Sequence, residues 1–239
     1  IKSEKTQACE SAEKVYNRPM AYKRRRKLTK KQKRKMILQG VILFLAFVGA
    51  VTLLSMTVNG VKRLFGKTGA VDAPQIDEQL LTVNEYSRPG IALGKINGIV
   101  VHYTANPGTG AQANRNYFEG LKDSHETKVS SHFVIGLNGE IIQCIPTTEI
   151  AYASNDRNTD TIAIECCHPD STGAFNQSTY DSLVHLTAWL CGEYGLTTED
   201  VIRHYDVTGK DCPKYYVEHP EAWERFLADV DAYMEQNGK

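Results

Sequence analysis

Apolar residues in the C-terminal two thirds of the chain follow two spacings, one typical of strands and one typical of helices. Short apolar runs rich in β-branched residues predict strands at residues 99–102, 161–166 and 201–204. Apolar positions at helical spacing predict helices over residues 111–121, 178–194 and 222–234. Because strands and helices alternate, we expect an α/β domain over residues 86–239, with a central mixed β-sheet flanked by helices.

Two further apolar runs, at residues 132–137 and 140–145, are separated by Asn138 and Gly139. An Asn-Gly pair between two such runs is typical of a β-hairpin with a type I′ turn, in which both central residues have positive φ. The sequence therefore predicts a hairpin within the sheet.

The longest apolar run lies at residues 36–58, which hold no charged side chain. A helix of that length measures ~34 Å, enough to cross a hydrocarbon core of ~30 Å. Ten basic residues lie between positions 23 and 35, and only three lie between the run and residue 67. The positive-inside rule then places the N-terminus in the cytoplasm and residues 86–239 outside the cell. We expect one transmembrane helix and a single-pass protein of the cell membrane.

The flanks of this run are polar or rich in helix breakers. Residues 1–35 form a basic segment that we expect to be cytoplasmic and disordered, and residues 59–85 a linker broken by glycine and proline. A cleaved signal peptide is the alternative to an anchor, although its apolar region is usually shorter, about 7–15 residues. The basic run beside an apolar span favours a membrane rather than nucleic acid as the partner. Since the chain begins with Ile1, we also expect residues before it in the full protein.

The formal net charge of zero conceals two opposite halves. Residues 1–67 hold 17 basic and 3 acidic side chains, a net charge of +14, and the remainder carries −14. Such asymmetry excludes one homogeneous globular domain. Six cysteines in 239 residues are too few for a disulfide scaffold. Four of them are expected to be buried thiols rather than disulfides: Cys144, Cys166, Cys167 and Cys191.

Candidate chemistry lies at the ends of two predicted strands, where His102 and His204 stand, and in the loop that contains Cys212. Two imidazoles and a thiolate are a three-ligand set that leaves a fourth position on zinc open, as a catalytic site requires. From the spacing alone, two structural histidines and a buried cysteine remain an alternative.

Five motifs carry a family resemblance: IVVHYTA, SSHFVIGLNGEI, AYAS, NTDTIAIEC and HYDVTGKDCP, in this order. They resemble the zinc-dependent N-acetylmuramoyl-L-alanine amidases of the type 2 family, which includes phage T7 lysozyme-like enzymes and peptidoglycan recognition proteins. The resemblance implies that His102, His204 and Cys212 bind Zn²⁺. It also places the family's lysine at Lys210 and its strand-end acid at Glu165. One departure is Ser131, which stands where relatives of the phage enzyme have a catalytic tyrosine.

Together with the anchor predicted from residues 36–58, the resemblance implies a membrane-anchored enzyme of cell-wall remodelling or lysis that hydrolyses the amide between N-acetylmuramic acid and L-alanine of the peptidoglycan stem peptide. Glu165 would move the proton from water to the leaving amine, and Lys210 would face the developing oxyanion. A surface carboxylate and a solvated lysine are the alternatives for these two residues. The alternative function is a non-catalytic peptidoglycan-binding module on a membrane anchor, which the serine at position 131 favours and Cys212 opposes.

Overall fold

The computed structural model describes residues 29–30, 35, 37, 39–41, 43–44 and 71–239. The chain separates into two compact units, residues 1–64 and 65–239. In the first unit, the described residues between 35 and 44 are helical, and four of them expose apolar side chains: Ile37, Val41, Leu43 and Phe44. Across the described residues, no helix combines the length and the apolar character needed to cross a membrane. Most of the predicted segments 1–35 and 36–58 lie outside the described residues.

The second unit contains a six-stranded sheet in the order β1-β4-β3-β5-β2-β6. The strands are β1 (Ile76–Glu78), β2 (Gly98–Tyr103), β3 (Phe133–Ile135), β4 (Ile141–Gln143), β5 (Thr161–Cys166) and β6 (Val201–Arg203). β3 and β4 pair antiparallel, and the other neighbouring strands run parallel. The predicted mixed sheet is therefore confirmed.

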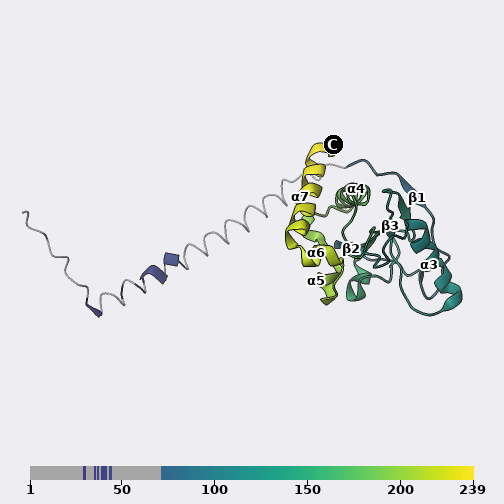
Figure 1. Cartoon of the computed structure of the whole chain (residues 1–239), viewed down its shortest axis with the longest axis horizontal. Coiled ribbons are helices and arrows are strands. Elements are labelled where there is room, and N and C mark those ends of the chain that lie inside the picture. Colours follow the sequence, from purple (N-terminus) through teal and green to yellow (C-terminus); the bar gives the residue numbers. More distant parts are fainter. Residues whose placement is uncertain (1–28, 31–34, 36, 38, 42, 45–70) are drawn as a thin grey trace, which may run out of the picture. The chain divides into compact units, whose positions relative to one another are not determined.

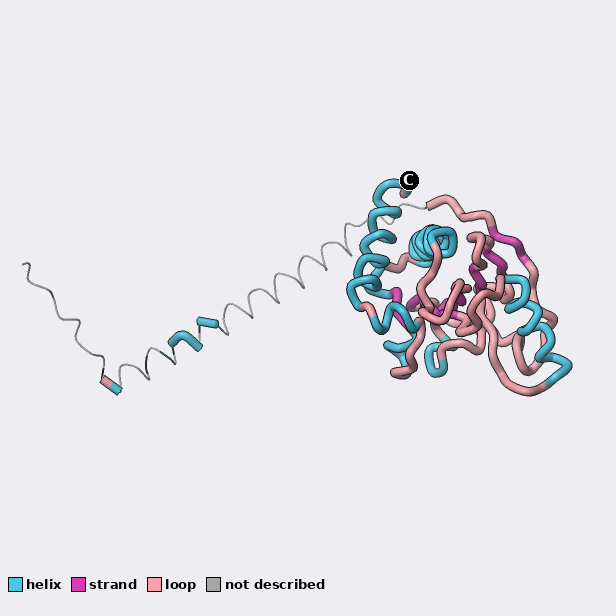
Figure 2. Tube along the Cα trace, in the orientation of Figure 1, coloured by secondary structure: helices cyan, strands magenta, loops and turns pink. Residues whose placement is uncertain are grey.

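Helices cover both faces of this sheet (Figure 1). The long ones are α3 (Ala111–Ser124), α4 (Gln177–Tyr194) and α7 (Pro220–Asn237). The short ones are α5 (His204–Thr208), α6 (Lys214–Glu218) and the 3-10 turns η1 (Asn155–Thr159) and η2 (Thr198–Asp200). α4 packs against α7 on one face, and α3 packs over β3 and β4. Figure 2 shows that long loops join these elements around the sheet.

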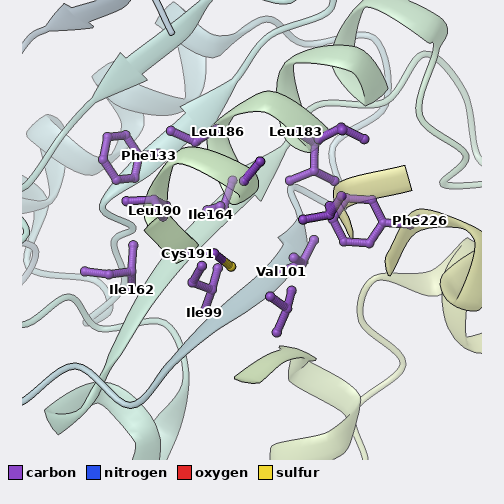
Figure 3. Close-up of a cluster of buried hydrophobic side chains, with 14 of the residues drawn as sticks. Ile99, Val101, Phe133, Ile162, Ile164, Leu183, Leu186, Leu190, Cys191 and Phe226 are labelled. Atoms are coloured by element: carbon purple, nitrogen blue, oxygen red, sulfur yellow. The ribbon is translucent and has the colours of Figure 1, made fainter. Parts of the chain in front are cut away.

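Alternation along β2 and β5 decides which face carries the polar residues. Val101 and Ile164 belong to the large apolar core that α4 and α7 complete, together with Leu183, Leu190 and Phe226 (Figure 3). Successive side chains of a strand point to opposite faces. His102 and Glu165, the next residues along their strands, therefore face away from α4 and α7. They are also register partners across β2 and β5, so they lie side by side.

The hairpin of β3 and β4 is present, but its turn is not type I′. Gly139 has a positive φ of 83° and Asn138 does not. The amide of Gly139 donates to the carbonyl of Gly136 at 3.1 Å, and that of Gly136 to Glu140 at 2.8 Å. These bonds describe a three-residue loop that ends in a left-handed glycine. The extra residue is the reason that Asn138 keeps a negative φ.

The folded unit extends further toward the N-terminus than the predicted boundary at residue 86. β1 pairs in parallel with β4, and Val71 and Leu81 are buried in the cores. Residues 71–85, which the sequence pattern assigned to a linker, are thus part of the domain.

Candidate metal centre

His102, His204 and Cys212 come together at one edge of the sheet. His102 lies near the carboxyl end of β2, His204 directly follows the neighbouring strand β6, and Cys212 lies in the loop between α5 and α6. One candidate ligand atom from each residue lies within 4.8 Å of the other two. All three side chains are buried. Carboxyl ends of adjacent parallel strands are a frequent place for binding sites, and the topology explains why residues far apart in sequence meet here.

The imidazoles are held in defined orientations. His102 Nε2 lies 3.1 Å from Ser154 Oγ, and its Nδ1 lies 3.8 Å from Cys212 Sγ. His204 Nε2 lies 3.0 Å from Asn155 Oδ1, whereas its Nδ1 is buried and makes no hydrogen bond to any described residue. A buried polar atom without a partner is costly unless a ligand satisfies it.

Electrostatics in the cluster favours neutral imidazoles. Burial lowers the pKa of His102 well below its usual range, and positive charge on His204 and Lys210 adds to the effect. Burial and Lys210 likewise lower the pKa of His204. Neutral imidazole is the form that binds metal ions, so the environment prepares both rings for that role.

Cys212 is an uncharged thiol in the absence of a cation. Burial raises its pKa to about 12, and the nearby charge of Glu165 adds to the rise. The backbone N–H of Tyr103, which donates a hydrogen bond to the sulfur, and the charge of Lys210 act in the opposite direction. A coordinated metal ion deprotonates a thiol outright, so the sulfur would ionise when a cation is bound.

Glu165 and Lys210 flank these three residues. Glu165 is half-buried, and its Oε2 is buried without a hydrogen-bond partner among the described residues. Burial raises the pKa of Glu165 to about 8, and the charge of Lys210 opposes the rise. Lys210 is exposed and forms no ion pair within the described part of the chain. One carboxyl group with a buried oxygen and one ammonium thus lie beside the candidate metal ligands.

A model of the family Amidase_2, described as N-acetylmuramoyl-L-alanine amidase, matches residues 92–215. This stretch is more than half of the chain and holds all five residues described above. The chain belongs to this family.

Two curated proteins and one solved structure that are similar to this chain agree with the family match. The N-acetylmuramoyl-L-alanine amidase CwlL of Bacillus licheniformis is 34% identical over 172 residues, which cover 67% of this chain and 48% of that protein. BlyA of Bacillus subtilis, which carries the same enzyme name, is 32% identical over 175 residues, with coverage of 64% and 46%. The catalytic domain of XlyA superposes with a TM-score of 0.56 at 28% identity and covers 66% of this chain and 99% of that domain. This chain therefore spans about half the length of these curated relatives.

Two buried polar residues of the domain, His132 and Ser131, belong to the framework of the fold. The Nε2–H of His132 donates to the carbonyl of Glu149 at 2.9 Å, and its Nδ1 accepts from the amide of Ala163 at 3.0 Å. The hydroxyl of Ser131 lies 2.9 Å from the carbonyl of Ala163 and 3.0 Å from that of Phe133. Both ring nitrogens of His132 are thus occupied by backbone groups. Ser131 is bonded to the backbone, at the position of the family's tyrosine.

The sequence alone gives Ser154 and Asn155 no role at the candidate metal centre, because the AYAS motif followed by Asn, Asp and Arg is typical of a plain polar turn. The cysteines agree with the prediction: Cys144, Cys166, Cys167 and Cys191 are buried free thiols.

Proposed function

We propose that the protein is a zinc amidase that hydrolyses the bond between N-acetylmuramic acid and the L-alanine of the peptidoglycan stem peptide. The observation that carries this proposal is the approach of His102, His204 and Cys212 to within 4.8 Å, inside a domain of the amidase family. The relatives named as N-acetylmuramoyl-L-alanine amidases support the choice of bond.

The donor set fits zinc. His204 Nδ1 is buried and has no partner among the residues that the structure describes, and His102 Nδ1 faces the sulfur. Two nitrogens with one sulfur are typical of a catalytic zinc site with an open position. When bound, zinc supplies Lewis acidity, which polarises a carbonyl group and acidifies water.

Glu165 would carry the proton in this reaction. Glu165 lies beside His102 on the neighbouring strand, and its Oε2 is buried. From this position its carboxylate would take a proton from the attacking water and later give it to the leaving amine of L-alanine. Partial burial makes the carboxylate a stronger base than it is in water. The ammonium of Lys210 would attract the negative charge that develops on the carbonyl oxygen.

A hydrolase and a non-catalytic binding module should behave differently with purified peptidoglycan. The full-length protein, purified in mild detergent, should release free stem peptides from peptidoglycan, as detected by mass spectrometry. A chelator should stop the release, and zinc should restore it. Zinc-loaded protein that sediments with peptidoglycan but releases no peptide would instead favour the non-catalytic binding module. Release that persists after metal removal and in Cys212→Ser would contradict the zinc mechanism.

We further propose that residues 36–58 anchor the protein in the cell membrane, with the N-terminus in the cytoplasm and the amidase domain outside. The uncharged run of 23 residues, the preceding basic residues and the exposed apolar side chains of Ile37, Val41, Leu43 and Phe44 support this location. After cell fractionation, the protein should stay with membranes in high salt and leave them in detergent. Release by salt alone would contradict the anchor.

A further inference from the structure

Two consecutive residues hold both candidate zinc histidines. Ser154 Oγ lies 3.1 Å from Nε2 of His102, and Asn155 Oδ1 lies 3.0 Å from Nε2 of His204. The histidines belong to different elements, β2 and α5, whereas their partners are adjacent in the loop that opens η1. A single short segment therefore contacts both rings on the side that faces away from the candidate metal.

The contact with Asn155 determines which nitrogen of His204 carries the hydrogen. An amide oxygen only accepts, so Nε2 of His204 must donate to Asn155, and Nδ1 keeps its lone pair. That Nδ1 is the buried atom without a hydrogen bond. In His102, Nδ1 lies 3.8 Å from the sulfur of Cys212, and Nε2 is directed at the serine hydroxyl. Nδ1 of His204 is thus set to offer its lone pair, and Nδ1 of His102 faces the sulfur, with the serine hydroxyl able to accept from Nε2–H.

The segment is itself fixed by its own hydrogen bonds. Asn158 Oδ1 accepts from the amides of Ala153, at 3.0 Å, and Ser154, at 2.6 Å. Ser154 is 1% exposed. Asn155 has a φ of 53°, a left-handed conformation that asparagine tolerates better than most residues. The backbone thus presents the two side chains in a preset arrangement before any ion binds.

We propose that Ser154 and Asn155 are positioning residues that fix the Nε2–H tautomer and the orientation of both zinc histidines. This inference rests on the proposed zinc site. Outer partners of this kind orient metal-bound histidines and increase their basicity, and their loss typically costs about 10- to 100-fold in metal affinity. Because one segment serves both rings, it also keeps the two Nδ1 atoms in register with each other and with the sulfur.

Four variants separate the hydrogen bond from the backbone. Asn155→Gly removes the acceptor and keeps the freedom to adopt positive φ, whereas Asn155→Asp retains both. Ser154→Ala removes the hydroxyl alone. Asp156→Ala is the control, because Asp156 is exposed on the same turn and its side chain makes no hydrogen bond or ion pair among the described residues.

Zinc affinity of the full-length chain is measured by competition with a chromophoric chelator. We expect Asn155→Gly and Ser154→Ala to bind zinc about 10- to 100-fold more weakly than the wild type, and Asn155→Asp and Asp156→Ala to differ by less than about threefold. If Asn155→Gly and Ser154→Ala both bound zinc with the affinity of the wild type, the inference would be overturned. Equal losses in Asn155→Gly and Asn155→Asp would also overturn it, because the acceptor would then be irrelevant.

A second measurement does not depend on metal. In the metal-free chain, ¹⁵N spectra of the histidine rings should show the Nε2–H tautomer for His102 and His204. In Asn155→Gly, His204 should become a mixture of tautomers while His102 is unchanged. Predominant Nδ1–H tautomers in the wild type would contradict the inference. Wild-type protein that binds no zinc would instead overturn the proposed function, and the tautomers would still decide whether these residues set the rings.

Discussion

His132 and His204 are both buried, in two regions of the domain that differ in how the ring nitrogens are used. In the framework region, both nitrogens of His132 are hydrogen-bonded to backbone groups, those of Glu149 and Ala163. At the candidate metal centre, one nitrogen of His204 is bonded to Asn155, and the other is buried without a partner in the described part of the chain. Both rings are nearly inaccessible to solvent. The difference between these two rings is the nitrogen of His204 that no described residue satisfies, and it leaves that ring available to a ligand.

The direction of the pKa shift does not make this distinction. Burial lowers the pKa of His132 to about 4, and it also lowers the pKa of His204. Both rings are neutral at pH 7 for the same physical reason, desolvation. The surroundings decide instead, because His204 is within reach of a second imidazole and a thiol.

The largest effect is expected when a ligand is removed from the candidate metal centre. Cys212→Ser and His102→Ala should each lose amidase activity by at least about 10⁴-fold, since polarisation by a metal is worth several kcal/mol and each ~1.4 kcal/mol is tenfold. Zinc content, measured by mass spectrometry of metals, should fall from one per chain toward zero. Thermal unfolding of the metal-free variants checks that the fold persists. Full zinc content in both variants would show that these residues are not ligands.

A change beside the ligands should separate catalysis from metal binding. Glu165→Gln preserves shape but cannot accept a proton, so activity should fall roughly 10²–10⁴-fold while zinc content stays at the wild-type level. The assay is stem-peptide release by metal-loaded enzyme. A variant with nearly full activity would show that Glu165 does not carry the proton in the reaction.

The framework histidine should respond in the opposite manner. His132→Gln removes the ring nitrogen that accepts from the buried amide of Ala163, which should lower the free energy of unfolding by about 1–3 kcal/mol, with zinc affinity unchanged. Denaturant titration and chelator competition measure the two quantities. Weaker zinc binding with unaltered stability would reverse the assignment of the two regions.

The same substitution should remove part of the pH dependence of stability. Folded His132 takes up a proton only near pH 4, whereas the unfolded ring does so near its ordinary pKa of 6.5. The unfolded state binds more protons in that window, so the wild type should lose ~3 kcal/mol from this ring as the pH falls from about 6.5 to about 4. Glu149, which Arg88 pairs at 2.7 Å, is the charged group that faces the ring. The difference between metal-free wild type and His132→Gln isolates this slope, because His102 and His204 contribute equally to both. Parallel pH profiles would contradict the prediction.

The sequence could predict elements whose apolar pattern is strong, and the ends of those elements carry the metal centre. β2, β5 and the three long helices were predictable because buried runs such as residues 99–102 have few alternatives. β1 was not, since Ile76 is the single apolar residue of that strand and pairing with β4 determines its place. The Asn-Gly pair indicated the hairpin, but the extra loop residue altered its turn.

The residues of the site divide in the same way, into those that the sequence predicts and those that it does not. His102 and His204 were identifiable because both end strands that the sheet brings side by side. Ser154 and Asn155 contact rings about 50 residues away in the chain, and no local pattern encodes a contact of that range. Their role depends on the path of the loop before η1, which only tertiary structure reveals.

The smallest effect is expected at Lys210, and the direction in which zinc affinity changes is the informative result. The ammonium lies close enough to lower the pKa of both candidate zinc histidines, so its positive charge opposes binding of a cation. Lys210→Gln should therefore bind zinc at least as tightly as the wild type. Its activity should fall by only about tenfold, because solvent screens the charge of this exposed side chain. Lys210→Arg, which keeps the charge, should recover most of the activity. Zinc affinity and initial rates in the three proteins test both directions. A parallel loss of zinc and activity in Lys210→Gln would mean that the lysine supports the metal centre rather than the reacting carbonyl.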